Sequence, residues 1–224
     1  IEDDTEIKLV GTNPFKYYSE AKKDGIETKP VVVGPFTLLK LARFTGNKSV
    51  EEFVDDTIKA YSELLNELSK LGVNWIQFDE PFLVHDITKE DLTLFDKIYN
   101  AVLAKKENIK VLLQTYFGDI RDSYENIIKL KFDAIGLDFI EGKETLNLIE
   151  KYGFPKDKIL FAGLVNGKNI WRNNYEKTIS TLNLLKNKGI EIVLSTSCSL
   201  LHVPFTVENE TKLSKAVLKH FAFA

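Results

Sequence analysis

Short apolar runs alternate with longer amphipathic segments along the whole chain, and this alternation limits the possible folds more than any other feature. Six runs are rich in Val, Ile and Leu and have the length of single strands: residues 29–34, 74–80, 109–116, 133–140, 158–165 and 191–197. Strands that are apolar on both faces are typical of parallel sheets covered by helices. The pattern therefore predicts an α/β fold built on a parallel sheet.

The segments between these runs predict helices with recognisable ends. A helix is expected to begin at Pro14 and to end before Gly25, because Pro favours the first helical turn and Gly favours the position after the last. Ser49 and Glu52 have the spacing of a capping box ahead of a long helix. The predicted helices after the first are residues 50–71, 89–106, 174–188 and 207–224.

Two architectures fit repeated strand–helix units: a doubly wound sheet and a TIM (βα)8-type barrel. The glycine fingerprint G-x-G-x-x-G of dinucleotide-binding sheets is absent. Polar residues follow nearly every run, as a barrel requires at the end where its site is assembled: Asp79, Glu80, Tyr116, Asp138, Asn166 and residues 195–199. The prediction is one domain, residues 1–224, forming an incomplete barrel of about six strands where a full barrel has eight.

Composition excludes several classes of protein. A net charge of −3 argues against a nucleic-acid binder, which would carry an excess of Lys and Arg. No run of about 18 apolar residues is present, so no membrane span is expected. One cysteine cannot form an internal disulfide, and this indicates a cytoplasmic protein. The absence of methionine predicts that the chain is a piece of a longer protein.

Three carboxylates stand out at the predicted strand ends. Asp79 and Glu80 are adjacent, so at most one can face the barrel axis. Such a group could act as a base or hold an amine, or it could cap loop amides. Asp138 lies within an apolar run, where a carboxylate must be paired or bound to a metal. The alternative for Asp138 is a hydrogen bond to a neighbouring strand end.

Two further segments carry groups of chemical interest. The segment 166–174 contains Lys168, Trp171 and Arg172, which could receive an anionic ligand. Alternatively, Arg172 could pair with a carboxylate while Trp171 packs the loop. Cys198 precedes His202 by four residues, but zinc needs three or four ligands, so this pair would have to recruit Asp138.

Six segments, taken together and in order, resemble the N-terminal half of the cobalamin-independent methionine synthase family. Proteins of this family have two fused barrels and transfer a methyl group from 5-methyltetrahydrofolate polyglutamate to homocysteine, which zinc holds in the C-terminal barrel. The resemblance covers essentially the whole chain. The segments that carry it are KPVVVGPFTLLKLARF, WIQFDEPFLVHD, VLLQTYFGD, GLDFIEG, GLVNGKNIWRNN and STSCSLLHVPFTVENETKL.

The resemblance implies that this barrel has lost a metal site. The His-x-Cys zinc pair of the catalytic barrel falls on Thr115 and Phe117, which are not usable zinc ligands. The zinc glutamate falls on Asp138 and the last zinc cysteine on Cys198, so these two are relic positions. The histidine that shuttles a proton falls near Lys168, and His202 matches no ligand. The expectation is that this part of the protein holds neither metal nor cofactor and has no catalytic residue.

The same resemblance implies a supporting role beside the C-terminal catalytic barrel of the same protein. This barrel would form the folate side of the site, and its first two strands would precede residue 1. The piece alone would be inactive. The candidate substrate-binding residues are Asp79, Glu80, Tyr116, Asp138 and Asn166. Two alternatives stay open: an independent small barrel enzyme using Asp79, Glu80 or Asp138, and a non-catalytic module that binds folylpolyglutamate.

Overall fold

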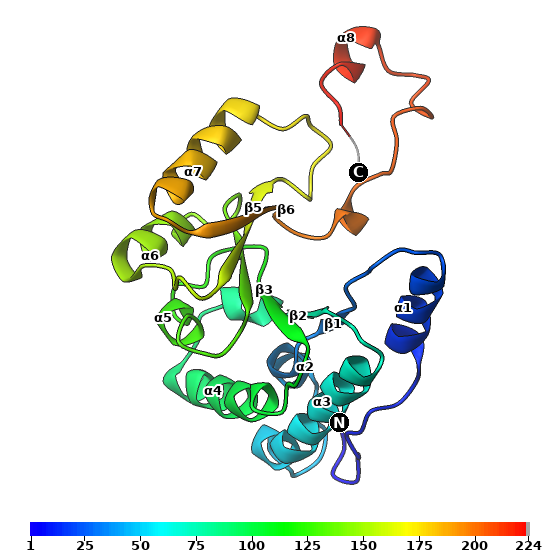
Figure 1. Ribbon diagram of the computed structural model, residues 1–224, viewed down its shortest axis with the longest axis vertical. Coiled ribbons are helices and arrows are strands. Elements are labelled where there is room, and N and C mark those ends of the chain that lie inside the picture. The colour runs from blue at the N-terminus through cyan, green and yellow to red at the C-terminus, as the bar shows by residue number, and fades with distance from the viewer. Residues whose placement is uncertain (223–224) are drawn as a thin grey trace. The chain divides into compact units, whose positions relative to one another are not determined.

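A computed structural model describes residues 1–222, with the backbone alone for His202 (Figure 1). The described residues form six strands in one sheet, in the order β1-β2-β3-β4-β5-β6. All six predicted strands are confirmed. Their bounds are β1 Val31–Val33, β2 Trp75–Asp79, β3 Lys110–Gln114, β4 Ala134–Asp138, β5 Ile159–Val165 and β6 Glu191–Thr196.

The strand order identifies the type of α/β fold. Each strand neighbours the one before it in the chain, and the β1–β2, β2–β3 and β5–β6 pairs are parallel. A doubly wound sheet would reverse its order at a switch point. Sequential parallel strands joined through helices are the arrangement of a (βα) barrel. With six strands instead of eight, the fold is a partial TIM-barrel-like fold, as the sequence predicts.

The chain divides into two compact units, of which unit 1 comprises residues 1–114 and 120–135. It contains strands β1 to β3 and two 3-10 helices, Val50–Phe53 and Pro81–Val84. An aromatic cluster fills its core: the ring of Tyr99 lies 4.6 Å from Phe95 and 5.0 Å from Phe132, and Phe36 meets Phe95 at 5.3 Å. Its α-helices are α1 Asn13–Lys23, α2 Pro35–Leu41, α3 Val54–Lys70, α4 Lys89–Leu103 and α5 Tyr124–Ile127.

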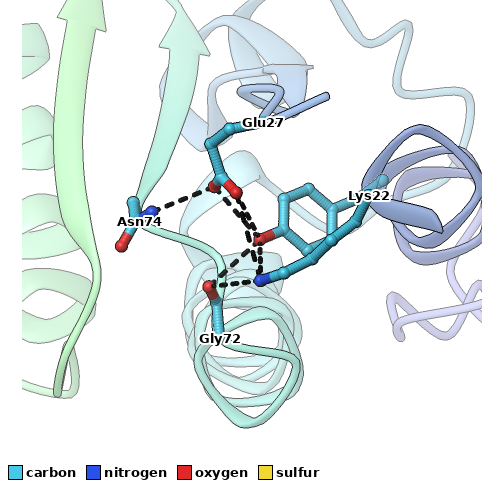
Figure 2. Close-up of polar contacts among 5 residues, drawn as sticks. Lys22, Glu27, Gly72 and Asn74 are labelled. Carbon is cyan, nitrogen blue, oxygen red and sulfur yellow. Dashed lines mark hydrogen bonds and ion pairs between the residues drawn. The ribbon is translucent and has the colours of Figure 1, made fainter. Parts of the chain in front are cut away.

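A cluster of hydrogen bonds connects α1 with the turn before β2 (Figure 2). The buried Tyr18 hydroxyl donates to the carbonyl of Gly72 at 3.0 Å and lies 3.1 Å from a carboxylate oxygen of Glu27. Lys22 Nζ donates to that hydroxyl at 2.8 Å, and Asn74 Nδ2 donates to Glu27 at 3.0 Å. These bonds join segments about 50 residues apart in sequence, so they contribute to tertiary structure.

Unit 2 comprises residues 115–119 and 136–222 of the described chain. It contains α6 Thr145–Tyr152, α7 Tyr175–Asn187, α8 Lys215–Leu218 and a 3-10 helix, Leu200–His202. Its core is aliphatic, with Leu160, Ala162 and Leu185 fully buried. Asn174 caps α7, because its side-chain oxygen accepts the N–H of Lys177 at 3.0 Å.

Most predicted helices are confirmed, and one is wrong. The segment 50–71 begins as a 3-10 helix and continues as α3, behind the predicted capping box of Ser49 and Glu52. The helices α2, α5 and α6 were not predicted. Within 207–222 only α8 is helical, because hydroxyl and backbone bonds form turns at 206–211 and the last residues pair with the 170–172 segment. Residues 223 and 224 lie outside the described part. Across residues 1–222, no helix has the length and apolar character needed to cross a membrane.

Candidate functional site

Glu80 follows β2 in unit 1 and is fully buried. Its two carboxylate oxygens accept the backbone N–H groups of Phe36 at 3.0 Å and Thr37 at 2.7 Å, which lie in the first turn of α2. The hydroxyl of Tyr99 also donates to Glu80. A carboxylate in this position satisfies amides that have no partner within the helix and interacts favourably with the helix dipole. Glu80 therefore caps backbone amides, as the second predicted role has it, but these amides belong to the first turn of α2 and not to a loop.

Burial controls the ionisation of Glu80. Removal from water raises the pKa of Glu80 to about 7, and its hydrogen bonds oppose this rise only in part. Gly34 is required beside it, since a Cβ there would lie 2.1 Å from a carboxylate oxygen of Glu80. Sequence reasoning missed Tyr99 and Gly34 as partners of Glu80, since folding alone brings them to this carboxylate.

Asp79, the last residue of β2, has a different environment. Its side chain is partly exposed and accepts a hydrogen bond from Gln77 Nε2 at 2.7 Å. Lys29 Nζ donates to the oxygen of the same Gln77 amide at 2.6 Å, and burial lowers the pKa of Lys29. The adjacent carboxylates Asp79 and Glu80 thus have separate roles, as the alternation of side chains along a strand predicts.

Asp138 ends β4 in unit 2 and is 1% exposed. One oxygen accepts the N–H groups of Ile140 at 2.7 Å and Glu141 at 2.9 Å, and the other accepts the N–H of Phe117 at 3.2 Å. Burial raises the pKa of Asp138, and these three bonds act in the opposite direction. The hydrogen bond to a neighbouring strand end, the alternative to metal binding for this residue, is therefore present.

The loop that Asp138 holds has an unusual backbone. Phe117 has a positive φ of 72°, which is costly for a bulky residue, so its N–H bond to Asp138 helps to maintain the conformation. The ring of Tyr116 packs 4.9 Å from that of Phe117 and is partly exposed. Thr115 donates its hydroxyl to the carbonyl of Gly136 at 2.9 Å. Thr115 and Phe117, which the resemblance places at a His-x-Cys pair, thus both form hydrogen bonds to residues of β4.

Cys198 lies beyond β6 and is 5% exposed. Burial raises the pKa of its thiol, which disfavours the thiolate that a metal would need. The thiol packs against the backbone of Gly167, where a Cβ would lie 2.9 Å from the sulfur. Asn166 precedes this glycine and is partly exposed. Its side-chain oxygen accepts the N–H groups of Lys168 at 2.8 Å and Asn169 at 3.1 Å.

The side chains that the structure describes do not fit a zinc site. Among the described residues, no three His, Cys, Asp or Glu side chains are grouped so that they could hold a metal ion. Both oxygens of Asp138 accept backbone N–H groups. The side chain of His202 lies outside the described part of the structure. That Asp138 and Cys198 are relic positions stays a prediction.

In the segment 166–174, Trp171 packs against another ring, Lys168 is paired with a carboxylate, and Arg172 has no carboxylate partner within residues 1–222. Lys168 forms an ion pair with Glu141 at 3.2 Å and lies 5.5 Å from the ring of Phe117. Trp171 packs on Phe221 with ring centroids 4.9 Å apart, so its predicted packing role is confirmed. Arg172 has no carboxylate partner within residues 1–222; its Nε donates to the carbonyl of Phe221 at 3.2 Å.

Comparisons with known proteins agree with this fold. Residues 1–189 match the family model described as cobalamin-independent synthase, N-terminal domain. The chain is 56% identical, over its whole length, to a 5-methyltetrahydropteroyltriglutamate–homocysteine methyltransferase of Lactococcus lactis, and covers 29% of that protein. It is 53% identical over 97% of its length to the protein of the same name from Campylobacter jejuni, again covering 29%.

A solved structure shows the same fold at low sequence identity. The B12-independent methionine synthase of a Shewanella species superposes with a TM-score of 0.64 at 18% identity, over 95% of this chain and 64% of that one. The chain spans about 30% of the length of the curated relatives it matches. On the family model and the identity across its whole length, the chain belongs to the cobalamin-independent synthase family and corresponds to part of the N-terminal domain.

Proposed function

We propose that the chain acts as the N-terminal barrel of a zinc-dependent, cytoplasmic methyltransferase that makes methionine. Its reaction would move a methyl group from 5-methyltetrahydrofolate polyglutamate to homocysteine. The observation that carries this proposal is 53–56% identity, over nearly the whole chain, to proteins named for that transfer. Those relatives are about three times longer, which leaves room for a zinc-bearing C-terminal barrel as partner.

We assign residues 1–224 to one domain with a supporting role. Glu80 and Asp138 have their oxygens occupied by backbone amides, so a supporting role suits them better than acid–base chemistry. Asp79 ends β2, Tyr116 follows β3 and Asn166 follows β5, and all three keep partly exposed side chains. For each of these residues taken by itself we propose a contact with folate, while Glu80 positions α2 and Asp138 positions the loops it bonds.

Kinetics of the longer methyltransferase test this assignment. Asp79→Ala, Tyr116→Ala and Asn166→Ala are each expected to raise KM for the folate substrate about tenfold while kcat changes little, because one lost contact is worth on the order of 1 kcal/mol. Asp24→Asn, an exposed change after α1, serves as the matched control. The isolated 224-residue chain should show no turnover.

Two results would contradict the proposal. A fall in kcat of about a hundredfold or more in Asp79→Ala, with the fold intact, would place catalytic chemistry in this barrel. Methyl transfer by the isolated chain would show that the chain is an enzyme by itself.

A further inference from the structure

A cavity of about 240 Å³ lies within unit 2, at the loop that joins β5 to α7. Figure 1 shows the course of this loop between the two labelled elements. Polar side chains from this loop and the first turn of α7 form much of its lining, and Phe139 and Ile140 add an apolar wall. No Asp or Glu lines the cavity among the residues that the structure describes. The polar and cationic lining residues that carry the argument are Asn166, Asn169, Trp171, Arg172, Asn174 and Lys177.

Three of the asparagines that line this cavity accept backbone N–H groups through their side-chain oxygens. The side-chain oxygen of Asn166 accepts two N–H groups of the following loop, at 2.8 and 3.1 Å. The oxygens of Asn169 and Asn174 each accept one backbone N–H, at 3.1 and 3.0 Å. With these oxygens occupied, the three carboxamide NH2 groups remain without a protein partner in the described structure. The oxygen of Asn166 accepts two N–H groups and those of Asn169 and Asn174 accept one each, so the capacity of the three side chains to accept is reduced, while each NH2 group keeps two N–H donors.

Two cations add to this donor set. Arg172 uses Nε for the carbonyl of Phe221, and its two terminal nitrogens have no acceptor within residues 1–222. Lys177, in the first turn of α7, likewise has no acidic partner in the described part of the chain. Lys168, by contrast, is already paired with Glu141. Within residues 1–222, therefore, cations without an acidic partner lie beside NH2 groups without an acceptor, and this favours an anionic ligand.

Residues 220–222 form backbone hydrogen bonds to the part of the cavity wall that contains Arg172. The Arg172 N–H donates to the carbonyl of His220 at 2.8 Å, and the N–H of Ala222 donates to the carbonyl of Ile170 at 2.8 Å. The rings of Trp171 and Phe221 pack against each other. The tail thus holds the loop in place, and this lowers the cost of ordering it when a ligand binds.

We propose that this cavity binds a small oxyanion with two negative charges, namely a phosphate group, free or as the head group of a small metabolite. Arg172 and Lys177 balance the two charges, and the three asparagine NH2 groups donate to the oxygens. The apolar wall of Phe139 and Ile140 would receive the organic part of a metabolite. The site stands on this cavity alone and does not depend on the methyl transfer proposed above.

Tryptophan fluorescence tests the site, since the chain has two tryptophans and one of them, Trp171, lines the cavity. Inorganic phosphate is titrated into the Trp75→Phe protein at mildly alkaline pH, with potassium chloride holding ionic strength constant. A saturable change in Trp171 emission is expected. Arg172→Met and Lys177→Met should each weaken phosphate binding about tenfold, the loss of one charge-assisted bond. Isothermal titration calorimetry with the unmodified chain provides a second measurement.

Lys186→Met is the matched control, because Lys186 is an exposed lysine on the same helix outside the cavity. It should leave phosphate affinity unchanged. The proposal is overturned if phosphate causes no saturable signal beyond potassium chloride, or if Lys186→Met weakens binding as much as Lys177→Met does. Acetate is a further probe: binding as tight as that of phosphate would contradict the assignment to a doubly charged oxyanion.

Discussion

At pH 4.5, replacing Glu80 with Ala is expected to lower the free energy of unfolding by about 3 kcal/mol. The change removes the acceptor of two backbone N–H groups in α2 and of the Tyr99 hydroxyl, and all three donors lie in a buried region. Each buried donor without a partner costs on the order of 1 kcal/mol or more. Urea denaturation measures the loss. A loss within about 0.5 kcal/mol, the usual range for surface substitutions, would show that Glu80 does not hold α2.

The pH dependence of the free energy of unfolding is an independent test of the pKa of Glu80. Because burial raises the pKa of Glu80 to about 7 from an ordinary value of 4.5, the folded protein binds its proton more tightly than the unfolded chain does. Below pH 4.5, Glu80 therefore makes its full contribution to the free energy of unfolding. This contribution falls by about 3 kcal/mol as pH rises towards 7.

Glu80→Gln is the matched control for this pH dependence, since glutamine has the shape of the protonated acid and cannot ionise. The stability difference between the unmodified protein and Glu80→Gln should change across this pH window in favour of the variant at higher pH. A difference that stays constant, or that changes in the opposite direction, would rule out a raised pKa.

The second large effect is expected at Asp138. Replacing it with Ala leaves the N–H groups of Phe117, Ile140 and Glu141 without their acceptor and should cost about 3 kcal/mol of unfolding free energy. The positive φ of Phe117 should relax in the variant, because Asp138 accepts the Phe117 N–H. Urea denaturation measures the stability, and near-ultraviolet circular dichroism reports on the Tyr116–Phe117 pair.

Glu141→Gln is the matched control for Asp138→Ala. Glu141 also lies in this loop, but its side chain is 43% exposed and pairs with Lys168 at the surface. Surface pairs of this kind contribute at most about 1 kcal/mol, so the control should cost much less. Equal losses in the two variants would mean that Asp138 has no special part in holding the loops.

The strands could be predicted from the sequence because each is a short run of apolar residues bounded by polar ones. The sequence does not predict helix α2, and the reason is different. Helix α2 starts at Pro35 within a predominantly apolar stretch, and Glu80, which caps its N-terminus, lies 44 residues after Phe36. A partner this distant in sequence leaves no local pattern. The prediction of a helix over 207–224 is wrong because residues 220–222 pair with residues 170–172. Amphipathic spacing cannot reveal a contact of this kind.

The chemistry of the strand ends was partly predictable. An acid in an apolar run must be paired, and this predicted the buried hydrogen bonds of Asp138. The choice between base and cap at Glu80 could not be made, because it depends on the position of α2. For the 166–174 segment, the sequence offered an anion site or a structural role. The structure shows packing at Trp171 and leaves Arg172 without an acidic partner in residues 1–222.

We propose that this barrel supports a site without holding a catalytic metal. Zinc content measures this most directly, after the purified chain has been exposed to zinc and desalted. Zinc far below one ion per chain is predicted, with the same result in Cys198→Ser, because both oxygens of Asp138 are occupied and the Cys198 thiol is buried with a raised pKa. Stoichiometric zinc that is lost in both Cys198→Ser and Asp138→Asn would contradict the account.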